Sequence, residues 1–271
     1  MVPPWVPDPL PPPGPDDNDG DAPLPDQTGA PPPPQPAPAP RSPAPLAPPG
    51  RFGPARTSLG RYAQSGSQGD MRRGLGHYVS KGLGGSSTAT RRLAGTARTA
   101  GSLYGALSSV AAGRAAEPGS PLDPALLSGR STDEVMNAII EATRPVDGTL
   151  DGEADRNAIH NALSELLARA PDADFLNLTI DDRLFIIERF VAADIFNRIE
   201  LDIGKHIQDK APSISAGLAR LRDMKDYIRQ AISSTFRKLR SSGGQPTARR
   251  IAAIVRQTIQ ETFEVFEAYV Q

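Results

Sequence analysis

The stretch TIDDRLFIIERFVAADIFNRIELDIG, residues Thr179–Gly204, decides the fold of this chain. Thr179 and Asp182 have the spacing of a capping box, in which side-chain oxygens satisfy free backbone N–H groups at a helix start. At about 100° per residue the apolar side chains form two nearly opposite stripes: Leu184, Ile187, Val191, Ile195 and Ile199, and Ile186, Phe190, Ala193 and Phe196. A helix that is apolar around most of its circumference is normally buried on several sides. We therefore predict a buried central helix that ends at Gly204.

Helix signals on both sides of this stretch predict an all-helical domain over residues 120–271. A second capping box, Ser131 with Glu134, starts a helix that ends near Thr143, and another helix spans residues 152–169. A helix over 213–240 and a last helix capped by Thr247 follow the central one. Their expected core-facing residues are Leu218, Leu221, Ile228, Ile232 and Leu239, then Ile251, Val255, Ile259, Phe263 and Phe266. The fold class is mostly α, with a multi-helix bundle around the central helix.

Residues 1–50 form a different kind of segment, which contains 21 of the 29 prolines and six aspartates against Arg41 alone. Proline lacks the N–H group and fixes φ, so we predict a disordered, acidic, Pro-rich tail with polyproline II character. One interpretation is a spacer or solubilising leader. The alternative is a docking segment with Trp5, the single tryptophan, as its aromatic anchor.

Residues 51–119 are rich in Gly, Ala and Arg and form a basic neck for which we predict short helices. LGRYAQSG at 59–66 and LGHYVSKG at 75–82 repeat each other at an offset of 16 residues. Each copy reads as a short helix ended by its glycine, with the leucine and tyrosine on one side. Gly101 and Gly105 form a GxxxG motif that permits close helix packing. Nearby arginines make membrane insertion costly, so we expect no membrane role.

The neck carries a positive charge that could bind nucleic acid. Residues 51–115 contain nine arginines and Lys81 against Asp70 alone, a net charge of +9. The candidate phosphate- or partner-binding residues are Arg56, Arg61, Arg72, Arg73, Lys81, Arg91, Arg92 and Arg98. Tyr62 and Tyr78 could stack on bases. The alternative is a basic surface that faces solvent or a protein, since the sequence contains no nucleic-acid-binding motif.

The C-terminal FEVFEAYV concentrates Phe263, Phe266 and Tyr269. One interpretation places these rings in the core of the domain. The alternative is a protein-docking surface, because aromatic side chains are enriched in protein–protein interfaces.

Patterns for catalysis or cofactor binding are missing from the sequence. It has no cysteine, and its three histidines, His77, His160 and His206, have no ligand spacing. No P-loop or nucleophile-elbow motif occurs. The loop from Asp147 resembles a calcium loop but has Ala158 where the bidentate carboxylate belongs. The chain is therefore predicted to be non-enzymatic, without a cofactor or metal, and to be cytoplasmic, since it lacks cysteine and a visible secretory signal.

Several long segments resemble QatB proteins, the subunit without recognised enzymatic motifs in the Qat anti-phage defence system of bacteria. The segments are VPPWVPDP, APPGRFGPARTSLGRYA, DMRRGLGHYVSKG, TATRRLAGTARTAGSLYGAL, GSPLDPALLSGRS, RPVDGT, LFIIERFVAADIF, LDIGKHIQDKAPS and FEVFEAY. They extend over nearly the whole chain.

The resemblance implies three companions: a P-loop ATPase (QatA), a QueC-like enzyme (QatC) and a TatD-like nuclease (QatD). It suggests an adaptor or scaffold, or a protein substrate of the QueC-like partner, with the tail presented to that enzyme and the helical body bound to another subunit. Similar proteins carry a Gly/Ser-containing leader upstream of VPPWVPDP, whereas this sequence begins at Met1, so we assign no modification residue. The alternative function is a nucleic-acid-binding subunit that presents DNA to the nuclease.

Overall fold

The structure is a computed structural model that describes residues 50–114, 119–240 and 246–270. Within these ranges every regular element is helical, which confirms the mostly α prediction. In chain order they are α1 (Gly53–Ser65), α2 (Gln68–His77), η1 (Tyr78–Gly82), α3 (Ser86–Arg92), α4 (Ala94–Ala111), α5 (Pro124–Leu127), α6 (Thr132–Thr143), α7 (Leu150–Arg169), α8 (Ile180–Ile199), η2 (Glu200–Gly204), α9 (Lys205–Lys210), α10 (Ile214–Arg240), α11 (Ala248–Glu267) and η3 (Ala268–Val270). The predicted disorder of the Pro-rich tail lies outside the described residues.

Helix α8 is the buried central helix that the sequence predicts. Thr179 caps its start by accepting a hydrogen bond from the backbone N–H of Asp182 at 3.1 Å. Ile187 and Phe190, one from each apolar stripe, have no exposed surface. Burying a side chain of this size stabilises a fold by roughly 1.5–3 kcal/mol. Packing on α4, α7 and α10 therefore holds α8 in place from several sides.

The helical path does not end at Gly204, where the sequence analysis placed its end. The π-helical turn η2 leads directly into α9, which reaches Lys210. Gly204 has φ −55° and ψ −44°, a right-handed helical conformation, and lacks the positive φ of a helix-ending glycine. A Cβ at this position would lie 2.8 Å from Glu200 Cγ. Close packing inside the turn therefore explains this glycine.

Helices α1–α4 belong to the same compact unit as the later helices, which comprises residues 47–271. Within it α1 packs on α2 and α9, while α4 packs on α8 and α11. The boundary placed between residues 119 and 120 therefore does not separate two cores. The two sequence repeats contribute to the shared core through Leu59, Tyr62, Leu75 and Tyr78, all of them buried.

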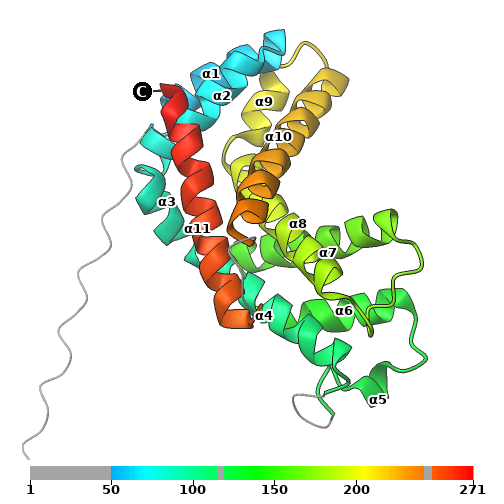
Figure 1. Ribbon diagram of the computed structural model, residues 1–271. Helices are drawn as coiled ribbons and strands as arrows, with labels where there is room; N and C mark the ends of the chain where they lie inside the picture. Colours follow the sequence, from blue (N-terminus) through cyan, green and yellow to red (C-terminus); the bar gives the residue numbers. More distant parts are fainter. Residues whose placement is uncertain (1–49, 115–118, 241–245, 271) are drawn as a thin grey trace, which may run out of the picture. The chain divides into compact units, whose positions relative to one another are not determined.

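The GxxxG pair of α4 makes its close approach to α11, which runs beside α4 (Figure 1). A Cβ on Gly101 would lie 2.9 Å from Ala248 O, and one on Gly105 would lie 3.5 Å from Ala248 Cβ. The small residues therefore serve packing within the fold. Across the described ranges, no helix has the length and apolarity required to cross a bilayer.

The helix starts predicted at Ser131, Thr179 and Thr247 are confirmed, whereas the helix expected from residue 152 begins at Leu150. Ser131 and Glu134 form a complete capping box at α6. Thr149 caps α7, and Thr247 caps α11 by accepting a hydrogen bond from the N–H of Arg250 at 3.2 Å. Each cap satisfies backbone N–H groups that have no partner within the helix.

The prediction that Leu218 of α10 faces the core is wrong. Leu221, Ile228 and Ile232 are buried as predicted, whereas Leu218 is 51% exposed. Gly217 is the residue that faces α9, since a Cβ there would lie 3.3 Å from Gln208 Cα. The next residue is rotated by about 100° and so leaves the interface. The side chain of Leu239 lies outside the described residues.

Candidate functional sites

All eight basic side chains of the predicted patch are exposed, but they are distributed over α1, α2, η1, α3 and α4. Asp70 pairs with Arg61 at 3.7 Å and with Arg73 at 3.3 Å. The guanidinium of Arg72 lies 5.5 Å from the ring centroid of Tyr227 and 5.9 Å from that of Tyr269. Part of this positive charge is therefore already engaged within the fold.

The proposal that Tyr62 and Tyr78 stack on bases is wrong, because both rings are buried. The Tyr62 hydroxyl donates a hydrogen bond to Arg220 O at 2.8 Å, and the Tyr78 hydroxyl donates one to Asp202 at 2.7 Å. Burial raises the pKa of Tyr62 to about 12, and burial raises the pKa of Tyr78 well above its usual range. Both hydroxyls therefore remain protonated donors near neutral pH.

Arg56 and Arg61 do share a cavity of about 300 Å³ with Lys210 and His206, between α1 and α9. His206 Nε2 lies 3.0 Å from Arg56 O, and because a carbonyl can only accept, Nε2 is the donor. Gly60 makes this approach possible, since a Cβ there would lie 3.2 Å from His206 Nε2. Three cationic side chains and no carboxylate line this cavity, which we call the α1–α9 basic cavity.

The C-terminal aromatic residues are core residues, and the docking role proposed for Phe263 and Phe266 is wrong. Their side chains are 1% and 0% exposed, and their ring centroids lie 6.3 Å apart. Tyr269 is half-buried, and its hydroxyl lies 2.5 Å from that of Tyr227. Helix α11 turns this side of FEVFEAYV toward α10. Trp5 lies outside the described residues.

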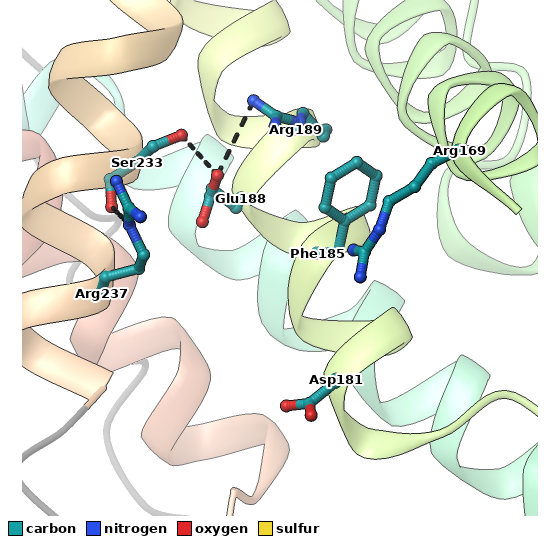
Figure 2. A pocket seen from close by; sticks show the side chains of 7 residues that line it. All are labelled: Arg169, Asp181, Phe185, Glu188, Arg189, Ser233 and Arg237. Atoms are coloured by element: carbon teal, nitrogen blue, oxygen red, sulfur yellow. Dashed lines mark hydrogen bonds and ion pairs between the residues drawn. The ribbon is translucent and has the colours of Figure 1, made fainter.

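A cavity of about 380 Å³ lies between α8, α10 and Arg169, the last residue of α7 (Figure 2). The guanidinium carbons of Arg169 and Arg189 each lie 4.7 Å from the centroid of the half-buried Phe185 ring. Across the cavity Ser233 donates a hydrogen bond to Glu188, and Arg237 Nε donates one to the Ser233 carbonyl at 3.2 Å. We call this site, which also includes Asp181, the arginine–phenylalanine cavity.

Arg189 is held in place by carboxylates, whereas Arg169 and Arg237 are exposed. The Nε of Arg189 lies 3.2 Å from Glu165, and the Nη1 of Arg189 lies 3.7 Å from Glu188. Cation–π contacts of this kind contribute about 0.5–2 kcal/mol each. The cavity therefore has an ordered aromatic floor and two exposed cations at its edges.

This cavity is absent from the sites predicted from the sequence. Asp181, Phe185 and Arg189 lie four residues apart along α8, and Glu188 lies three residues after Phe185, which is the spacing of one helix face. That spacing was a detectable signal. Arg169 and Arg237 come from other helices, and their proximity depends on how α7 and α10 pack on α8.

A network of charged side chains is buried where α4, α7 and α8 meet. Asp194 is 0% exposed and Asp155 is 3% exposed. Thr96 donates a hydrogen bond to Asp194 at 2.5 Å, and Arg198 Nε lies 3.3 Å from the same carboxyl oxygen. Arg198 and Arg144 contact the two oxygens of Asp155 at 3.5 and 3.2 Å.

Asp155 in this network has an unusual titration. Burial is the main cause that raises its pKa, to about 7, and the charge of Asp194 and a hydrogen bond with it act in the same direction. Arg198 and Arg144 partly oppose this rise. Because Asp155 and Asp194 are enclosed in the core, the arrangement joins helices rather than receiving a substrate. In the described part of the chain, no group of three or more His, Cys, Asp or Glu residues could hold a metal ion.

The fold and these sites define an all-α protein with arginine-rich surface cavities. A family model described as Qat anti-phage system associated protein QatB matches residues 84–266. The chain belongs to the QatB family, which confirms the resemblance seen in its sequence. Membership implies a role in the Qat anti-phage system, with other Qat components as partners. Comparisons with curated proteins and with solved structures find no match.

Proposed function

We propose that this chain is a non-catalytic, cytoplasmic adaptor that holds components of the Qat system together. The arginine–phenylalanine cavity is the observation that carries the proposal. Arginine and aromatic residues, phenylalanine among them, are enriched in protein–protein interfaces. Here Arg169 and Arg237 are exposed on either side of a fixed ring, so each can pair with a carboxylate of a partner.

The partners proposed for this role are the three companions implied by the QatB resemblance. These are the P-loop ATPase, the QueC-like enzyme and the TatD-like nuclease. The chemistry of the cavity favours a partner surface that presents Asp or Glu side chains near an apolar group. The carboxylates would pair with the arginines and the apolar group would cover Phe185.

Co-purification of the other Qat components with a tagged version of this chain tests the proposal. The test variant is Arg169→Glu combined with Arg237→Glu, and the matched control is Arg222→Glu, an exposed arginine of α10 that does not line the cavity. Point variants are needed because deleting residues 120–271 would remove helices on which α1–α4 pack. We expect the double variant to lose at least one component that the control retains. If both proteins retain every component, or if wild type retains none, the proposal fails.

A second candidate function, binding of nucleic acid, is supported by the α1–α9 basic cavity. Arg56, Arg61 and Lys210 can approach phosphate groups together, and no carboxylate lines the cavity. Each phosphate neutralised by such a residue releases counterions, so the affinity should fall as salt rises. The buried tyrosines remove base stacking as a contribution and leave backbone contacts.

DNA binding by the full chain, measured over a series of salt concentrations, tests this second function. Reversing Arg56 and Lys210 to glutamate should abolish the salt-dependent binding, whereas reversing Arg222 should leave most of it. Wild-type protein that binds no DNA at low salt would exclude this function.

A further inference from the structure

A groove of about 480 Å³ lies between α7 and the end of α8 with η2, apart from the two cavities described above. Its lining consists of Leu150, Glu153, Ala154, Asn157, Asn161, Asn197, Glu200 and Leu201. We call it the asparagine groove. Three of its properties point to the same kind of ligand.

Two large apolar side chains are exposed at the groove. Leu150, the first residue of α7, is 81% exposed, and Leu201, in the π-helical turn η2, is 63% exposed. The apolar residues near Leu201 in the chain, Ile199 at the end of α8 and Ile203 in η2, are buried. Single π-helical turns inside α-helices occur frequently at functional sites. Two exposed leucines at one groove form an apolar surface that a ligand can cover.

The asparagines offer a repeating set of hydrogen-bonding groups. Asn157 and Asn161 are one helical turn apart on α7, and within the described residues neither side chain makes a hydrogen bond. Four residues of helix rise about 6 Å, while every second residue of an extended chain advances about 6.6 Å. Each amide has both a donor and an acceptor, as does each peptide unit. The two side chains can therefore pair with alternate peptide units of an extended segment.

Asn197 on α8 adds a third amide with a fixed orientation. Its Nδ2 donates a hydrogen bond to Ala154 O at 3.4 Å. This leaves its side-chain carbonyl oxygen as an acceptor for a ligand N–H group.

The charge of the groove selects a basic ligand. Its charged lining residues are Glu153 and Glu200, and no cationic side chain lines it. Glu153 is exposed and Glu200 is half-buried. A lysine or arginine beside the apolar residue of a bound segment would therefore be favoured over an acidic residue.

We propose that the asparagine groove binds an extended segment of another Qat component, which places an apolar side chain against Leu150 and Leu201 and a lysine or arginine beside Glu153 and Glu200. The segment's backbone pairs with Asn157 and Asn161. This inference rests on the proposed adaptor function and adds a second docking surface, opposite in charge preference to the arginine–phenylalanine cavity. Such a groove would recognise an extended segment, while the arginine–phenylalanine cavity would recognise an acidic surface.

The test uses the full chain and overlapping short peptides that together cover the sequences of the other Qat components, with binding measured by fluorescence polarisation. We expect at least one peptide with an apolar residue beside a lysine or arginine to bind. Its affinity should fall roughly tenfold or more in Leu201→Ser and in Asn157→Ala combined with Asn161→Ala. The matched controls are Leu218→Ser and Asn137→Ala, an exposed leucine and an exposed asparagine outside the groove, and they should bind as wild type does.

The inference is overturned if no peptide binds wild type, if bound peptides are equally tight in the groove variants, or if acidic peptides bind best. Circular dichroism spectra of all variants identify any loss of fold, and a photo-crosslinking residue at position 201 provides an independent measurement of contact. Failure here leaves the adaptor proposal testable, because co-purification with the Arg169 and Arg237 variants reports on a different cavity.

Discussion

Replacing Asp155 by asparagine tests whether the buried charged network holds a proton that it releases near neutral pH. Asparagine has nearly the shape of a protonated aspartate but cannot ionise. Asp155 is buried beside Asp194, with Arg144 and Arg198 on its two oxygens. If its folded-state pKa is about 7, the carboxyl is protonated in the folded protein below that pH.

The sign and size of the effect follow from proton binding. Between the ordinary pKa of 3.8 and the folded value of about 7, the folded state keeps a proton on Asp155 that the unfolded state has lost. The free energy of unfolding of the wild type therefore falls as pH rises through this window. At about 1.4 kcal/mol per pKa unit, the total contribution is roughly 4 kcal/mol. This stabilisation is fully present below the unfolded-state pKa of 3.8 and is lost as pH rises through the folded-state pKa of about 7.

Urea unfolding over a series of pH values measures this contribution. We expect Asp155→Asn to change the free energy of unfolding little at pH values below the unfolded-state pKa of 3.8. Above it, the variant should be more stable than wild type by an amount that grows with pH to roughly 4 kcal/mol near pH 8. Asp172→Asn, which removes an exposed carboxylate outside the network, is the control for the loss of one negative charge. A loss of several kcal/mol at every pH would refute the reasoning. It would mean that Asp155 is ionised throughout and that its removal leaves buried arginines without their partner.

Three further predictions concern packing and helix starts. Gly101→Ala should lower the free energy of unfolding by about 1–3 kcal/mol, because its Cβ would meet the Ala248 carbonyl oxygen at 2.9 Å. Gly105→Ala has ordinary contact space at 3.5 Å and should raise the free energy of unfolding by roughly 0.5–1 kcal/mol. Thermal unfolding of both variants shows whether the two changes have opposite signs. Phe263→Ala should cost about 3–5 kcal/mol by urea unfolding, since the ring is 1% exposed, and unchanged stability would contradict its place in the core. Ser131→Ala removes half of a capping box and should cost about 1 kcal/mol by the same measurement, with no change expected to the helical content by circular dichroism.

Helix starts were predictable because they depend on neighbours in the chain. At Ser131, Thr179 and Thr247 the side-chain oxygen accepts a hydrogen bond from an N–H only three residues later, so the sequence contains both partners. The same locality explains why the end of the first repeat at Gly66 was predicted, since a positive φ there requires no distant contact. Gly204 shows the limit of this approach. The sequence around Gly204 cannot distinguish a glycine that ends a helix from one that relieves crowding inside a turn.

Which apolar or charged side chains are covered was less predictable, since coverage depends on distant helices. Tyr62 reaches Arg220, 158 residues away, and becomes a core residue rather than a base-stacking one. From their spacing alone, Phe263 and Phe266 could have been either buried in the core or exposed on the surface. The arginine–phenylalanine cavity likewise combines α8 with residues that only packing brings near it.

The sequence by itself determined that the chain is helical, where the longer helices after residue 120 begin, and that it resembles the QatB family, because these properties depend on short-range spacing and on residue identity. Only the tertiary structure decided that the neck and the C-terminal helices share one core, that the C-terminal rings are buried, and where cavities of opposite charge preference lie. The physical reason is that a helix has several faces of comparable composition, and the free energy gained by covering a face depends on the helix that packs against it.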